Sequence, residues 1–125
     1  MAESSFTPEE IAVYRRNAQR LREQDRPAER IRREAAWQLA RQAAALLKEQ
    51  FQVTKVVAFG SLTKAVTFTA WSDVDIAAWG IEPADTLRAI GAVMDISDAP
   101  MVNLVDVSTC KPAILAEIER DGVEL

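Results

Sequence analysis

Residues 55–80 constrain the fold of this chain more than any other segment. An apolar run, Val56–Phe59, ends at Gly60-Ser61, and eleven residues later the sequence Ser-Asp-Val-Asp leads into a second apolar run. Short apolar runs bounded by glycine and polar residues are typical of buried strands. The pattern therefore predicts a strand, a tight turn, a short helix or loop, and a second strand that carries two carboxylates.

The two aspartates at the start of the second strand are Asp73 and Asp75. Side chains alternate along a strand, so both project from one face, with Cα atoms roughly 6.5 Å apart. Two carboxylates this close repel one another at neutral pH, and a hard cation such as Mg²⁺ relieves that repulsion. Gly60 lets the backbone approach phosphate oxygens, and Ser61 offers them a hydroxyl and an N–H. A phosphate-binding turn beside a carboxylate pair predicts metal-assisted nucleotidyl transfer.

Composition excludes several kinds of site. The 125 residues contain no histidine, which excludes Ser-His-Asp triads and the common zinc sites, so a metal would bind oxygen ligands. Cys110 is the only cysteine, as expected in a reducing compartment. The N-terminus is polar and acidic, and no apolar run approaches the length that spans a bilayer. We therefore expect a cytoplasmic protein with no membrane partner.

Residues 1–50 are predicted to form an N-terminal helical arm of two helices. Thr7 and Pro8 are typical of a helix start, and the helix is expected to reach about residue 24. Pro27 should kink the helix or restart it as a second helix that ends near residue 50. One apolar stripe is expected on each helix: Ile11, Tyr14, Ala18 and Leu21 on the first, and Ile31, Ala35, Leu39, Ala43 and Leu46, widened by Ala36, Trp37, Ala40 and Leu47, on the second.

The arm is basic, with ten Lys/Arg against eight Asp/Glu, whereas residues 51–125 hold five against eleven. Its first stripe is thin and lies among arginines, so it buries little apolar area. Two interpretations remain open: the first helix packs loosely on its own domain, or it docks a partner protein or a second subunit in a homo-oligomer. Binding of nucleic acid is disfavoured because acidic residues are interleaved with the arginines.

The rest of the chain alternates helical and strand patterns. Residues 82–93 and 112–120 are predicted helices, 101–107 a third strand, and 123–125 a short fourth strand. Strands separated by helical segments predict an α/β or α+β fold, in which a small mixed sheet is flanked by helices. We place the domain that contains the carboxylates at residues 51–125, after the arm at residues 1–50.

The pattern Gly60-Ser61, about a dozen residues, then Asp73-x-Asp75 before an apolar strand resembles the nucleotidyltransferase superfamily related to DNA polymerase β. The resemblance covers residues 51–125, and the small size is similar to its minimal (MNT) branch. Many members of that branch are antitoxins paired with a helical HEPN ribonuclease toxin. The resemblance implies transfer of AMP from ATP to a tyrosine of that toxin, with one or two Mg²⁺ ions.

Carried over residue by residue, the resemblance assigns Gly60, Ser61 and Ser72 to nucleotide binding and Asp73 and Asp75 to metal binding and catalysis. Lys64-Ala65 stands where the family commonly has an Arg-Gly pair. Lys64 is therefore either a triphosphate ligand, without the bidentate geometry of arginine, or a solvated lysine.

A third acid on a neighbouring strand completes the site in active members of the superfamily, and Asn103 stands at that position here. Asparagine can offer a metal a carbonyl oxygen but cannot accept a proton. Asp106 is the only carboxylate on that strand, and alternation places it on the opposite face. Either Asp106 serves as the catalytic acid near the end of the strand, or the third acid is missing.

Three functions remain open at this stage. The first is the adenylyltransferase antitoxin. The second is a catalytically weak or inactive fold that neutralises its partner by binding alone, which Asn103 and the arm favour. An aminoglycoside nucleotidyltransferase ranks third, because those enzymes normally carry an added substrate domain that 125 residues cannot supply. Near the site, Phe68, Trp71 and Trp79 are expected to pack in the core or loops rather than to stack on adenine.

Overall fold

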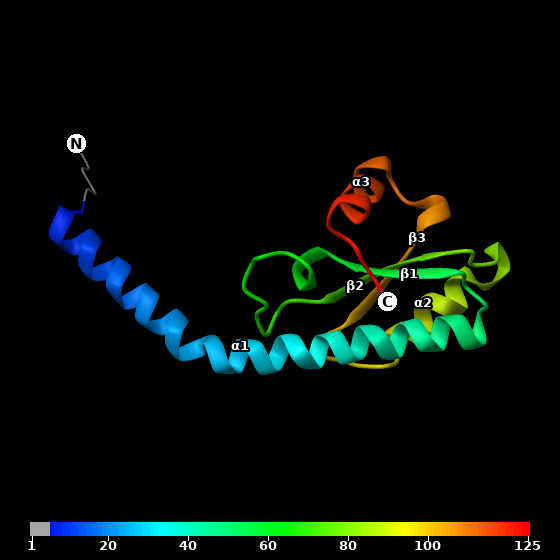
Figure 1. Cartoon of the computed structure of the whole chain (residues 1–125), viewed down its shortest axis with the longest axis horizontal. Helices are drawn as coiled ribbons and strands as arrows, with labels where there is room; N and C mark the ends of the chain where they lie inside the picture. Colours follow the sequence, from blue (N-terminus) through cyan, green and yellow to red (C-terminus); the bar gives the residue numbers. More distant parts are fainter. Residues whose placement is uncertain (1–5) are drawn as a thin grey trace.

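The fold is seen in a computed structural model of the whole chain (Figure 1). The structure describes residues 6–125, and the side chains of residues 19–25 lie outside that description. Three α-helices, four strands and three short 3₁₀ turns follow one another in these described residues: α1 Pro8–Gln50, β1 Lys55–Phe59, η1 Gly60–Leu62, β2 Val74–Trp79, η2 Pro83–Asp85, α2 Thr86–Met94, β3 Val102–Asp106, η3 Val107–Thr109, α3 Pro112–Asp121 and β4 Val123–Glu124.

The four strands form one mixed sheet in the order β3-β2-β1-β4. β1 pairs antiparallel with both β2 and β4, whereas β2 pairs parallel with β3. The connection between the parallel strands contains α2, as parallel neighbours require a crossover. The predicted α+β fold with a small mixed sheet and flanking helices is therefore confirmed.

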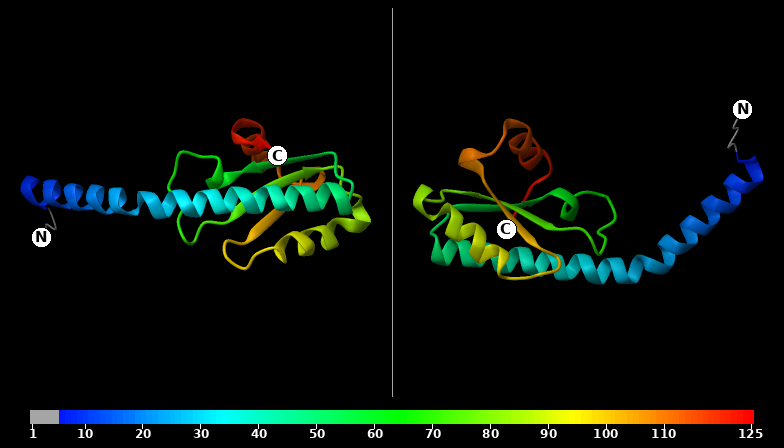
Figure 2. Two further views of the ribbon diagram at one scale, coloured as in Figure 1. Left: turned by 60° about the horizontal axis from the view of Figure 1, so that its bottom comes forward. Right: turned by 180° about the vertical axis from the view of Figure 1, so that it is seen from behind.

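Helices cover the two faces of the sheet unequally. α1 and α2 lie on one face and α3 lies on the other (Figures 1 and 2). Alternation along each strand feeds both layers: Val56 and Ile76 belong to the larger buried cluster under α1 and α2, while Val57 and Ala77 pack with Ile118 of α3. The larger layer is the main core, and the smaller layer lies between the sheet and α3.

The arm is a single helix, so the predicted division into two helices near Pro27 is wrong, whereas the alternative expectation of a kinked helix agrees with the structure (Figure 1). α1 runs for 43 residues through Pro27, and the Thr7 side chain caps it by accepting a hydrogen bond of 3.1 Å from the Glu10 N–H. Its axis bends in the light-blue part, near the proline (Figure 1). Proline removes one N–H donor and crowds the preceding turn, which bends a helix whose other hydrogen bonds persist.

The two halves of α1 have different surroundings. The inner half belongs to the main core, which it enters through a stripe of small residues centred on Ala36, Ala40 and Ala43. The predicted stripe is confirmed at Ala43 and at its widening residues Ala36 and Ala40, but it is wrong at Ala35 and Ile31, which are exposed, Ile31 to 72%. Alanine lets a helix approach a sheet closely, so the alanine side faces inward.

The outer half of α1 projects away from the sheet (Figures 1 and 2). Phe6 and Tyr14 are 71% and 74% exposed, and Ile11 is also exposed. The interpretation that this helix packs loosely on its own domain is therefore wrong for these side chains, while Leu21 lies outside the described side chains. Among the described residues, no helix is both long enough and apolar enough to cross a membrane.

Candidate functional site

The two aspartates lie together at the start of β2, on the face of the sheet that α3 covers. Asp75 is in β2 and its Cα pairs with that of Asn103 on β3. The Asn103 amide nitrogen donates to Asp75 Oδ1 at 3.3 Å and to Asp73 Oδ2 at 3.5 Å. A single amide therefore spans both carboxylates, and we call Asp73 and Asp75 the carboxylate pair.

Gly60 brings the η1 turn into contact with the carboxylate pair. Its φ is +75°, a conformation that favours glycine, and a Cβ placed on it would lie 2.5 Å from Asp75 Oδ2. The register explains this proximity, because Phe59 pairs with Asp75 and Gly60 follows directly. Any side chain at position 60 would displace the Asp75 carboxylate, so the turn and the acid form one site.

Asp75 is the electrostatically strained member of the pair. Burial raises its pKa above the usual range, and the negative charges of Asp73 and Glu117 raise it further. The hydrogen bond from Asn103 and the charge of Lys64 act in the opposite direction without cancelling the rise. A cation beside Asp75 would relieve this strain, because it favours the ionised form.

Lys64 and Glu117 meet close to the carboxylate pair. Their ion pair is 2.6 Å long, and both side chains are partly buried. Lys64 follows the η1 turn, whereas α3 brings in Glu117. The lysine is thus near the predicted triphosphate position but already has a partner. Sequence reasoning missed Glu117, although it lies three residues after Ile114 on α3, a spacing that places both side chains on one face of the helix.

The remaining predicted contacts have structural partners. Ser61 is half-buried in η1 beside Gly60. The Ser72 hydroxyl accepts a hydrogen bond of 2.9 Å from the Thr69 N–H and so holds the turn before Asp73. Phe68 is fully buried, which confirms its predicted packing, but Trp71 is 92% exposed, so the packing prediction is wrong for Trp71.

Asp106 lies on the other face of β3, so its assignment to the catalytic group is wrong. Its carboxylate is 7% exposed. It accepts hydrogen bonds from the Ser108 N–H at 3.0 Å, the Ser108 hydroxyl at 2.7 Å and the Thr86 hydroxyl at 3.2 Å. The Asp106 side chain follows the alternation of β3 and is not turned toward the site at the end of the strand. It caps η3 instead.

The donor set at the site suits one metal ion. Within the described residues, no cluster of three His, Cys, Asp or Glu side chains could hold a metal. Mg²⁺, however, commonly binds one or two carboxylates and completes its shell with water and substrate phosphates. Asp73 and Asp75 fit such an ion, and the Asn103 amide nitrogen already bonds to both of them, so a second ion would lack its own carboxylate.

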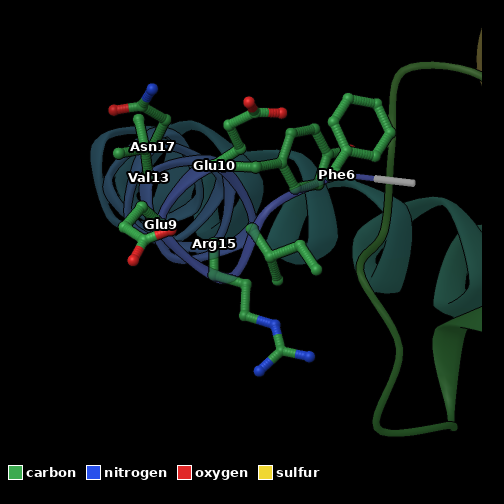
Figure 3. Close-up of a pocket in the computed structure, with 8 residues that line it drawn as sticks. Phe6, Glu9, Glu10, Val13, Arg15 and Asn17 are labelled. Carbon is green, nitrogen blue, oxygen red and sulfur yellow. The ribbon is translucent and has the colours of Figure 1, made fainter. Parts of the chain in front are cut away.

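A surface pocket lies elsewhere, at the outer end of α1 (Figure 3). Apolar side chains, including Phe6, Val13 and Tyr14, supply much of its lining, with Glu9, Glu10 and Arg15 at its edge. It is formed by the start of one helix and shares no residue with the carboxylate pair. Chemistry requires converging polar groups, so we place the candidate active site at the carboxylate pair.

Comparison with known proteins places the fold. No family model matches the sequence, and no curated protein matches it either. A chain in a crystal structure of a mutant toxin–antitoxin MntA-HpeT superposes with a TM-score of 0.56 at 16% identity, covering 68% of this chain and 70% of that chain. A second mutant of MntA-HpeT gives a TM-score of 0.55 at 20% identity, covering 68% and 69%.

A third solved structure is the tri-AMPylated Shewanella oneidensis HEPN toxin in complex with MNT antitoxin. Its TM-score is 0.45 at 16% identity, covering 77% of this chain and 70% of that chain, and this weaker likeness carries no argument. The first two likenesses show that this chain shares its fold with a chain of the MntA-HpeT structures.

Proposed function

We propose that this protein is a minimal nucleotidyltransferase that acts as an antitoxin. It transfers AMP from ATP to a tyrosine of a HEPN-type helical toxin, with Mg²⁺. The observation that carries the proposal is the contact between the glycine turn and the carboxylate pair, since a Cβ on Gly60 would lie 2.5 Å from Asp75 Oδ2. A phosphate held by this turn lies beside carboxylates that suit its metal ion.

The residues divide the reaction between them. Gly60 and Ser61 bind the triphosphate, and Asp73 and Asp75 hold the ion. The tyrosine oxygen of the acceptor attacks the α-phosphorus of ATP, the bond to the β-phosphate oxygen breaks, and pyrophosphate leaves with the electron pair of that bond. Bound Mg²⁺ would supply charge neutralisation on the phosphates and lower the pKa of the attacking hydroxyl.

Asn103 sets the expected rate of this reaction. It lies within 3.5 Å of both carboxylates but cannot accept the proton that the tyrosine releases, which therefore passes to water. Lys64 forms an ion pair of 2.6 Å with Glu117, and this competes with contact between Lys64 and a triphosphate oxygen. Both features favour a slow enzyme, which is sufficient to modify a partner once.

The partner follows from the fold likeness and the arm. The solved structures with which this chain shares its fold are of a toxin–antitoxin pair. The outer half of α1 exposes Phe6, Ile11 and Tyr14, apolar side chains that a bound protein would cover. We propose that a HEPN-type toxin is both the partner and the acceptor, in the cytoplasm.

Nucleotide binding tests the site before any acceptor is known. Calorimetry should detect ATP binding that requires Mg²⁺, and the Asp73→Asn/Asp75→Asn double variant should abolish it. The matched control is Asp95→Asn/Asp98→Asn, which removes the same charge from two exposed positions and should bind like the wild type. Equal binding by wild type and site variant would place the nucleotide elsewhere and overturn the proposal.

A second candidate function is neutralisation by binding alone. The replacement of the expected third acid by Asn103 favours it specifically. Incubation with ATP labelled at the α-phosphate and a HEPN-type toxin separates the two functions. Label on the toxin supports transfer, whereas an inhibited but unlabelled toxin supports binding alone. A parallel incubation with an aminoglycoside in place of the toxin tests the third candidate, since label on the aminoglycoside would indicate a small-molecule transferase.

A further inference from the structure

A polar cluster on α1 forms hydrogen bonds with the η1 turn and with the segment that follows it. Arg33 donates from one guanidinium nitrogen to the carbonyl of Leu62 at 2.8 Å and to that of Ser61 at 3.4 Å. Its other terminal nitrogen donates to the Val66 carbonyl. One side chain therefore binds three carbonyls of the segment, and two of these belong to the η1 turn itself.

Two neighbours on α1 complete the cluster. Glu29 accepts hydrogen bonds from Arg33 Nε and from the Phe68 N–H, both at 3.1 Å. Arg32 donates to the Phe68 carbonyl at 2.8 Å. These contacts also hold the pKa of Glu29 below its usual value, the Phe68 N–H being the main cause. We call Glu29, Arg32 and Arg33 the α1 latch.

The latch orders a segment that has little other reason to be ordered. Residues 63–73 connect η1 to β2 without a helix or strand of their own. Fixing such a segment costs about 1–2 kcal/mol of backbone entropy per residue, which specific contacts must offset. Phe68 is its fully buried anchor, and the Arg33 guanidinium lies 5.8 Å from the Phe68 ring centroid.

The direction of the bonds gives the latch a consequence for the site. In a helical turn, the carbonyls point toward the C-terminal end and the N–H groups toward the other end. Arg33 binds the Ser61 and Leu62 carbonyls of η1, and Gly60 at the start of the same turn lies against Asp75. The position of Gly60 against the carboxylate pair is therefore tied to the hydrogen bonds that Arg33 donates.

We propose that Arg33 is a positioning residue for the nucleotide site: oriented by Glu29, it holds the carbonyls of η1 and so keeps Gly60 and Ser61 in place beside Asp75, where the triphosphate binds. This inference rests on the proposed function. It assigns a role in the site to a residue 28 positions before Ser61 that touches neither nucleotide nor metal. It also makes the inner half of α1 part of the machinery rather than a support.

The test compares Arg33→Ala and Arg33→Lys with Arg41→Ala. Arg41 is a matched control because it lies on the same helix and stacks on Trp37. Calorimetry at a temperature well below unfolding gives the dissociation constant for Mg²⁺·ATP. We expect Arg33→Ala to raise it at least about tenfold, Arg33→Lys to have an intermediate effect because lysine lacks the fork of donors, and Arg41→Ala to leave it unchanged.

Two further readouts distinguish positioning from simple stabilisation. Millimolar guanidinium should restore part of the affinity of Arg33→Ala, because the ion can refill the vacated site, and should leave Arg33→Lys unchanged. Amide hydrogen exchange without nucleotide should be faster at residues 61–68 in Arg33→Ala, while residues of β2 and β3 keep their wild-type rates.

Each outcome has a distinct meaning. A lower melting temperature for Arg33→Ala with an unchanged dissociation constant would overturn the positioning role and leave the proposed function standing. Unchanged exchange at residues 61–68 would overturn the latch itself. If the wild type did not bind Mg²⁺·ATP, the proposed function and the positioning role would both fall, and that failure is visible in the wild type alone.

Discussion

Asp75 and Asp106 are two buried or half-buried acids on neighbouring strands with opposite surroundings. Asp106 accepts three hydrogen bonds, from the Ser108 N–H, the Ser108 hydroxyl and the Thr86 hydroxyl. Asp75 has one amide donor at 3.3 Å and two further acids nearby, Asp73 and Glu117. The first acid has the partners that a buried charge requires, and the second lacks them.

The difference separates a structural carboxylate from a functional one. A satisfied acid stabilises the fold, whereas an acid crowded by like charges is tolerated where a ligand or cation completes it. Burial alone would identify Asp106 rather than Asp75 as the functional acid, because Asp106 is the more buried of the two. The comparison predicts that substitution of Asp75 will mainly reduce catalysis, whereas substitution of Asp106 will mainly reduce stability.

The largest expected effect is on catalysis at Asp75. Asp75→Asn removes a metal ligand and should reduce the initial rate of labelled AMP transfer by at least about 10³-fold, or roughly 4 kcal/mol. Asp106→Asn should retain most of the rate when assayed at a temperature at which it is folded. An Asp75→Asn variant within about tenfold of the wild-type rate would remove Asp75 from the site.

The next effect is on stability at Asp106. Asp106→Ala leaves the Ser108 N–H and two hydroxyls without their acceptor, which should lower the free energy of unfolding by about 2–3 kcal/mol. Urea denaturation measures this change, with Asp98→Ala, an exposed acid, as the control. If the two substitutions cost the same, the hydrogen bonds of Asp106 are not what stabilises η3.

A substitution at Asn103 would sharpen the comparison by adding the expected third acid. Asn103→Asp places a carboxylate within reach of both members of the pair, so the melting temperature in EDTA should fall by a few degrees, roughly 1 kcal/mol. Mg²⁺ should reverse the loss, and AMP transfer should rise about tenfold because the new acid can accept the proton. Asn103→Ala, which adds no charge, should lose the Mg²⁺ effect. A faster reaction without Mg²⁺ dependence would contradict the arrangement.

The smallest effect is the pH dependence of stability at Asp75. Its folded pKa is raised above the usual value of 3.8, so its stabilising contribution is present below that value and is lost as the pH rises through the folded pKa. Asp75→Asn should therefore be more stable than the wild type at neutral pH and lose this advantage on acidification to about pH 4. Urea unfolding at the two pH values measures the difference. If Asp75→Asn were more stable than the wild type by the same amount at both pH values, the charge of Asp75 would not be the source of the difference.

Local rules predicted the part of the site that is close in sequence. The two-residue spacing of Asp73 and Asp75 put both side chains on one face, and the same alternation separated Asn103 from Asp106. The break at Gly60 was readable because an apolar run met the one residue that accommodates a positive φ. Each of these inferences uses a period of two or a single backbone conformation.

Contacts between distant segments were beyond those rules. Glu117 reaches the site from α3, and Arg33 reaches the turn from α1, so neither position is signalled by spacing near Gly60. The expected stripe of α1 was right at Ala43 and at the residues expected to widen it, such as Ala36 and Ala40, but wrong at Ile31 and Ala35, which are exposed. The helical period leaves the centre of a broad apolar face undetermined, and the close approach to the sheet that favours the alanine side is a contact between distant segments.

The bend in α1 sets the position of the outer end of the helix relative to the sheet. From Pro8 to Pro27 the helix extends about 28 Å at 1.5 Å per residue, so a change of about 10° at the bend moves the tip by about 5 Å. A shift of that size exceeds the length of a hydrogen bond. The angle of this bend therefore sets where anything bound at the tip lies relative to the carboxylates at the start of β2 (Figure 1).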